Sequence, residues 1–277
     1  MSLPVNTMIR KSSGEIEKFS TEKLKKSLKQ VGLVHNDSEE VASELTSQID
    51  TNNFSTNDIY NRTKELLFKK SHLAGLKYSL KKAILELGPT GFVFEKFVAK
   101  NLEAENYKTE INLSLEGHCI GHEIDISAFR DEYHILGECK FHNHQETKND
   151  IKIALYVKAR MEDLRANPQN KFDDFYLISN TSFSKDAIKF SQCAGLKLIG
   201  YNYPLENNFY QMIEKNKHYP ITCIPWLKKN EINDLISKNI ILTHDLFEQV
   251  DILKKYGYSQ TQIDQFKEIY LQHLAKA

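Results

Sequence analysis

The spacing of apolar residues changes twice along the chain, and this change most limits the folds open to its 277 residues. Between residues 5 and 87, and again beyond residue 205, apolar residues recur every three or four positions, as in an amphipathic helix. Between these regions, three segments alternate apolar and polar residues, as in a half-buried strand. The sequence therefore predicts a central domain with a β-sheet between two helical regions.

The N-terminal region is predicted to be helical over 19–33, 37–49, 55–70 and 73–87. Gly88 and Pro89 follow the last of these segments and interrupt any continuing helix. We therefore place the first domain at 1–88.

The central region opens with an amphipathic helix over 92–107 and continues with alternating strands over 108–117, 122–130 and 133–141. The order helix, strand, helix, strand follows over 150–164, 173–180, 184–195 and 196–202. This order predicts a mixed α/β sheet flanked by helices, in a domain over 89–204. The last region, 205–277, is predicted to be helical over 230–240, 243–257 and 259–277, and we assign it no site.

The composition is that of a soluble globular protein, with 40% hydrophobic and 27% charged residues and a formal net charge of zero. A chain with no net charge does not attract nucleic acid through its overall electrostatic field, so any DNA contact must come from a local basic patch. Its four cysteines form no CxxC pair, which favours reduced thiols in the cytoplasm. No apolar run approaches 18 residues, so we expect no membrane partner.

Two ionisable residues, Glu138 and Lys140, lie two positions apart in the apolar strand 133–141 and therefore share one face. Burying such groups is costly unless they are paired, bound to a metal or used in chemistry. If the strands 122–130 and 133–141 pair across their short turn, Asp125 converges with both. Two carboxylates with a backbone carbonyl and water suit Mg²⁺, and a neighbouring lysine can orient water or stabilise phosphate charge. The alternative is a structural ion pair.

Asp125, twelve further residues and then Glu138-Cys139-Lys140 resemble the signature of the PD-(D/E)xK nuclease superfamily. Residues 91–109, with their Phe94-Glu95 pair, resemble the opening helix of the Mrr-like restriction endonucleases, and 175–202 resemble the segment after the catalytic strand there. The resemblance spans about 89–204. It implies Mg²⁺-dependent DNA cleavage, with the metal on Asp125 and Glu138. The implied catalytic residues are Glu95, Asp125, Glu138 and Lys140.

Residues 9–33, IRKSSGEIEKFSTEKLKKSLKQVGL, resemble the start of an ATP-cone, the nucleotide-binding regulatory module of ribonucleotide reductases. Residues 55–60 and 73–84 resemble later segments of that module. The implied contacts to ATP or dATP are Lys11, Glu17, Ser20, Lys23, Leu24, Thr56, Ile59 and Tyr60. Lysines near a helix N-terminus can neutralise a triphosphate, while apolar side chains hold the base. The alternative is an ordinary helical domain with a lysine-rich solvated face.

These observations predict a multidomain α and α/β protein: a helical ATP-cone, a mixed-sheet restriction-endonuclease-like core and a helical C-terminal region. We expect a nucleotide-regulated, Mg²⁺-dependent DNA endonuclease whose partners are DNA and an adenine nucleotide. Cleavage of both DNA strands needs two active sites, and each chain has one. We therefore also expect a homo-oligomer. The alternative function is a catalytically inactive, nucleotide-sensing DNA-binding regulator. No P-loop occurs, so nucleotide hydrolysis is not expected.

Overall fold

The computed structural model describes residues 8–11, 14–48, 54–88, 90–144 and 146–274. Its backbone contacts divide the chain into two compact units, residues 1–80 with 271–274 and residues 81–270 with 275–277. Across the described ranges, no helix combines the length and apolar character needed to cross a membrane.

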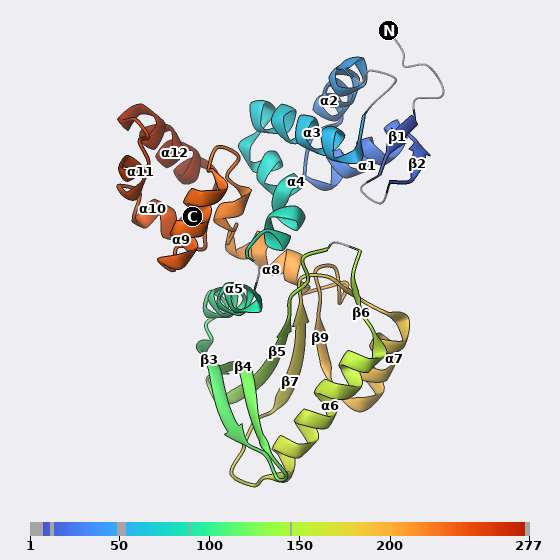
Figure 1. Ribbon diagram of the computed structural model, residues 1–277, viewed down its shortest axis with the longest axis vertical. Coiled ribbons are helices and arrows are strands. Elements are labelled where there is room, and N and C mark those ends of the chain that lie inside the picture. The colour runs from blue at the N-terminus through green and yellow to red at the C-terminus, as the bar shows by residue number, and fades with distance from the viewer. Residues whose placement is uncertain (1–7, 12–13, 49–53, 89, 145, 275–277) are drawn as a thin grey trace. The chain divides into compact units, whose positions relative to one another are not determined.

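The first unit contains a two-stranded hairpin and a group of helices (Figure 1). Its elements are β1 (Met8–Arg10), β2 (Ile16–Lys18), α1 (Thr21–Gln30), α2 (His35–Gln48), α3 (Thr56–Lys70) and most of α4 (His72–Leu85). All four predicted helices are present. Leu28, Val41, Leu45 and Leu67 meet in one buried cluster, as their helical spacing requires. The hairpin was not predicted, because two three-residue strands carry too little alternation to be detected.

The second unit is built on a five-stranded mixed sheet in the order β3-β4-β5-β7-β9. The antiparallel strands β3 (Lys108–Glu116), β4 (Gly121–Arg130) and β5 (Tyr133–Lys140) are joined by short turns. The strands β7 (Asp174–Ser179) and β9 (Lys197–Ile199) continue the sheet parallel to β5. The predicted mixed α/β sheet is thus confirmed.

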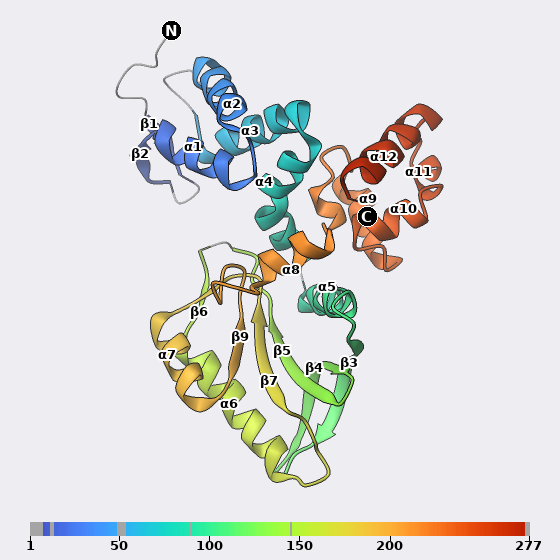
Figure 2. The same ribbon diagram turned by 180° about the vertical axis from the view of Figure 1, so that it is seen from behind.

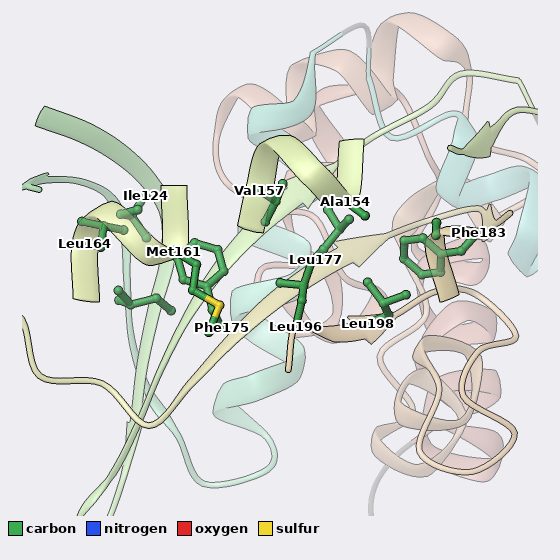
Figure 3. Close-up of a cluster of buried hydrophobic side chains, with 12 residues drawn as sticks. Ile124, Ala154, Val157, Met161, Leu164, Phe175, Leu177, Phe183, Leu196 and Leu198 are labelled. Atoms are coloured by element: carbon green, nitrogen blue, oxygen red, sulfur yellow. The ribbon is translucent and has the colours of Figure 1, made fainter. Parts of the chain in front are cut away.

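Two helices, α6 (Ile151–Ala166) and α7 (Lys185–Ala194), cover one face of this sheet (Figures 1 and 2). The core beneath them contains Met161 and Leu164 of α6 against Phe175 and Leu177 of β7 (Figure 3). A further helix, α5 (Gly91–Glu103), packs against β3, β4 and β5. Side chains of α5 can therefore meet those of β4 and β5.

The C-terminal part of the second unit is helical and has its own apolar cluster. It comprises α8 (Phe209–Asn216), a 3₁₀ turn (Ile221–Cys223), α9 (Lys229–Ser237), α10 (Thr243–Glu248), α11 (Ile252–Lys255) and α12 (Gln260–His273). The predicted helix over 243–257 is two short helices, because the backbone leaves helical geometry at Gln249 (φ −116°, ψ 30°). This break lets Val250 and Leu253 both enter the cluster. Lys100 of α5 forms an ion pair with Asp245 at 3.0 Å.

Candidate active site

Asp125 lies in β4 at a gap in the pairing with β3 and just beyond the end of the pairing with β5. Towards β3, the register runs from Leu113↔Ile124 to Ile111↔Ile126 and leaves the position of Asp125 unpaired. The residue opposite is Asn112, whose left-handed backbone (φ 54°) distorts β3 there. The Asp125 carboxylate instead accepts a hydrogen bond from the Cys139 backbone N–H at 2.7 Å. A local break of this kind turns a side chain away from the regular sheet surface.

Glu138 lies in β5, one register step beyond the pair Ile126↔Gly137, and is therefore the residue across from Asp125. Directly opposed residues of antiparallel strands present their side chains on the same face. Burial, together with the charge of Asp125, raises the pKa of Glu138 to about 7. Burial also raises the pKa of Asp125. The structure thus brings together the two carboxylates that the sequence selected as metal ligands.

Glu95 reaches the same acidic group from α5. Burial, together with the charges of Asp125, Glu123 and Glu138, raises its pKa to about 7. One carboxylate oxygen of Glu95, Oε2, is buried and has no hydrogen-bond partner. A buried carboxylate oxygen without a donor is unfavourable, unless a cation or a water supplies the missing interaction.

Lys140 lies at the end of β5 and is exposed. Its positive charge partly opposes the rise that burial causes in the pKa of Asp125 and Glu138, so it lies within electrostatic reach of the two acids. Its backbone carbonyl accepts a hydrogen bond from the Ser179 hydroxyl at 2.8 Å. The buried Asn149 amide in turn donates to Ser179 at 2.8 Å. This chain of polar contacts fixes the backbone from which the lysine projects.

Arg160 is the residue of this site that sequence reasoning missed. It projects from α6, donates one guanidinium N–H to the Glu138 carboxylate and another to the backbone carbonyl of Glu123. Only 11% of the Arg160 side chain and 15% of the Glu138 side chain are exposed. No local sequence pattern predicts this ion pair, because it joins a strand residue to a helix residue 22 positions later. The only sequence signal was the rarity of arginine, with five in the chain.

The donor set matches the chemistry of Mg²⁺, which prefers carboxylate oxygens with a few retained waters. Asp125 and Glu138 supply two such groups, and the unpartnered oxygen of Glu95 is available nearby. Mutual repulsion of these acids is what a divalent cation would relieve. Within the parts of the chain that are described, no three His, Cys, Asp or Glu side chains are grouped closely enough to hold a metal by themselves. The residues therefore fit an ion that keeps several waters better than a closed protein cage.

The predicted nucleotide contacts of the first unit divide into a charged group and an apolar group. Lys11 contacts Glu15 and Glu17 at 3.0 and 3.1 Å, and Lys23 lies 3.8 Å from Glu17. Hydrogen bonds with Glu15 and Glu17 raise the pKa of Lys11. The Ser20 hydroxyl caps α1 by accepting the Lys23 backbone N–H at 3.2 Å.

The apolar members are largely internal. Leu24 and Ile59 pack in the helical core, where they are 6% and 9% exposed. Thr56 is the first residue of α3, and Tyr60 stacks on Tyr78 with ring centroids 5.4 Å apart. The structure therefore brings Lys11, Glu17 and Lys23 together, and Leu24 and Ile59 form part of the core around which α1 and α3 pack.

Two known proteins are similar to this chain over more than half of its length. An uncharacterised protein from Archaeoglobus fulgidus is 32% identical over 149 residues, which cover 54% of this chain and 83% of that protein. The crystal structure of the protein of unknown function AF1548 is similar at 29% identity with a TM-score of 0.53, covering 65% of this chain and 95% of that one. These similarities establish a family and a fold, and neither relative has an assigned activity.

A more distant similarity is to the MspJI restriction endonuclease in complex with a 27-mer oligonucleotide. The identity is 12% and the TM-score 0.27, covering 65% of this chain and 40% of that one. A likeness at this level supports no inference about function. The family described as AF1548-like, C-terminal, matches residues 219–269, which lie in the C-terminal helices. With the archaeal relative covered over most of its length, this chain belongs to the AF1548-like family.

Proposed function

We propose that the chain is a Mg²⁺-dependent DNA endonuclease of the restriction type, with its active site in the second unit. The observation that carries this proposal is the convergence of Asp125, Glu138 and Glu95 beside Lys140 at the end of β5. Four ionisable groups on three elements are costly to gather in a partly buried place without a ligand that compensates them. A divalent cation and a phosphodiester together supply that compensation.

Each side chain has a separate role in this proposal. Asp125 and Glu138 would hold the ion, which when bound would supply Lewis-acid chemistry to the phosphodiester and to a water molecule. Lys140, exposed at the strand end, orients the attacking water or stabilises negative charge on the phosphate. Glu95 accepts a hydrogen bond from water through its unpartnered oxygen and so supports the site.

The test is incubation of the purified full chain with supercoiled plasmid DNA, with Mg²⁺ or with EDTA. We expect nicked or linear DNA with Mg²⁺ and intact DNA with EDTA. A protein that shifts plasmid mobility in a gel without ever cutting would be the inactive DNA-binding regulator instead. A matched incubation with single-stranded RNA shows whether the activity is specific for DNA.

We further infer that the first unit binds ATP or dATP and regulates cleavage, and that the chain acts as a homo-oligomer. The support is the group Lys11, Glu17 and Lys23 beside the capped N-terminus of α1, where a helix favours anionic groups. Regulation is tested by plasmid cleavage with and without each nucleotide. Oligomerisation is tested by sedimentation with and without each nucleotide.

Replacing Lys23 with Ala is expected to weaken ATP binding about tenfold, because one charge-assisted contact to a phosphate is lost. Isothermal titration calorimetry with ATP and dATP measures this loss. Lys29→Ala is the matched control, since Lys29 is an exposed lysine in the last turn of the same helix. If both variants bind ATP and dATP with the affinity of the unmodified chain, Lys23 is not part of the nucleotide site.

A further inference from the structure

Arg160 holds Glu138 through a contact that a metal ion would also need. The guanidinium is bound on one side by the Glu138 carboxylate and on the other by the Glu123 carbonyl. Its Cζ lies 5.5 Å from the ring centre of Tyr156, one turn earlier in α6. The Nε of Arg160 is buried and has no hydrogen-bond partner. Arg160 is thus held mainly by its contacts to the β4–β5 acid site.

A guanidinium and a divalent cation compete for a carboxylate because both are attracted by the same negative charge. The carboxylate contacted by Arg160 belongs to the residue opposite Asp125. A cation shared by Asp125 and Glu138 would therefore meet a positive charge beside the carboxylate that it has to bind. Two positive charges a few ångströms apart repel each other by on the order of kilocalories per mole in a partly buried site.

We propose that Arg160 is a built-in counter-ion that occupies Glu138 in the ion-free chain and competes with the metal for that carboxylate. This inference rests on the proposed metal site at Asp125 and Glu138. Arg160 compensates the acid pair when no ion is bound, so that the site folds without metal. Removing it leaves Glu138 buried without its partner, which is unfavourable until a metal binds. Arg160 is accordingly a positioning residue, and its effect is on ion affinity.

The experiment measures Mn²⁺ binding to the full chain at pH 8.5 by electron paramagnetic resonance of the free ion. Mn²⁺ takes the same oxygen ligands as Mg²⁺. Arg160→Gln is expected to tighten Mn²⁺ binding about tenfold, because a neighbouring positive charge is removed. Arg160→Lys keeps the charge without the planar fork and is expected to stay within about threefold of the unmodified chain.

Arg165→Gln is the matched control. Arg165 lies on the same helix, donates to the Asp173 carbonyl at 2.9 Å and stacks over Phe172 at 5.2 Å. Like Arg160, it donates to a backbone carbonyl and lies over an aromatic ring. Unlike Arg160, it contacts no carboxylate among these partners. Its replacement is expected to leave Mn²⁺ affinity unchanged.

Asp125→Asn separates this inference from the proposed function. If Mn²⁺ binding depends on Asp125 but Arg160→Gln leaves it unchanged or weaker, the competition is disproved and the metal site stands. If Asp125→Asn binds Mn²⁺ as well as the unmodified chain, the metal site is wrong and the competition falls with it.

Should Arg160→Gln prove unstable, its melting temperature gives a second measurement. Mn²⁺ is expected to raise that temperature more in the variant than in the unmodified chain, and an equal or smaller rise would overturn the inference.

Discussion

Asp125→Asn is expected to reduce Mg²⁺-dependent plasmid cleavage by about a thousandfold or more. The substitution removes an anionic metal ligand, and a bound metal contributes several kilocalories per mole to stabilising the transition state. The amide oxygen of Asn can still accept the Cys139 N–H that Asp125 accepts at 2.7 Å, so the local fold is expected to persist. Initial rates of plasmid nicking at saturating Mg²⁺ measure the effect.

Lys140→Ala is expected to lose about a hundredfold or more in the same assay, with unchanged thermal stability. The side chain is exposed, so its removal leaves no cavity. Glu132→Gln, in the exposed turn between β4 and β5, is the control and should cut normally. Undiminished cleavage by both Asp125→Asn and Lys140→Ala would refute the assignment of the active site.

Mn²⁺ affinity is expected to fall about tenfold between pH 8 and pH 6. Burial raises the pKa of Glu138 to about 7, so its carboxylate is about 90% ionised at pH 8 and about 10% at pH 6. A metal must displace the proton, and affinity therefore falls as the pH drops through this range. The fall approaches a hundredfold if Glu95, whose pKa is also raised to about 7, contributes. Titration calorimetry with Mn²⁺ across this pH range measures the slope.

Glu95→Gln distinguishes the two acids. It removes the ionisation of Glu95 and is expected to leave at most the tenfold dependence that belongs to Glu138. It should also lower the pKa of the other acids, because one neighbouring negative charge is gone. An Mn²⁺ affinity that does not change between pH 8 and pH 6 in the unmodified chain would contradict the assignment of Glu138 as a ligand.

Much of the fold follows from local patterns that a single sequence contains. The alternation in 122–130 and 133–141 predicts both strands, and the short turn between them predicts their antiparallel pairing. The observed register Ile126↔Gly137 places Asp125 across from Glu138 on that basis. These features are predictable because side-chain period and turn length act between neighbours in the chain. Short strands, and the break at Gln249, could not be seen in this way.

The sequence alone determined most of the helices, the order of the main strands and the choice of Asp125, Glu138 and Lys140, because strand period and short turns couple residues close in the chain. The resemblance to known nucleases already grouped Glu95 with these acids, but only the tertiary structure decided that one of its oxygens is left unsatisfied and that Arg160 binds Glu138. Both depend on how α5 and α6 pack on the sheet. That packing is set by buried surface shared among many residues distant in sequence, such as Met161 and Phe175.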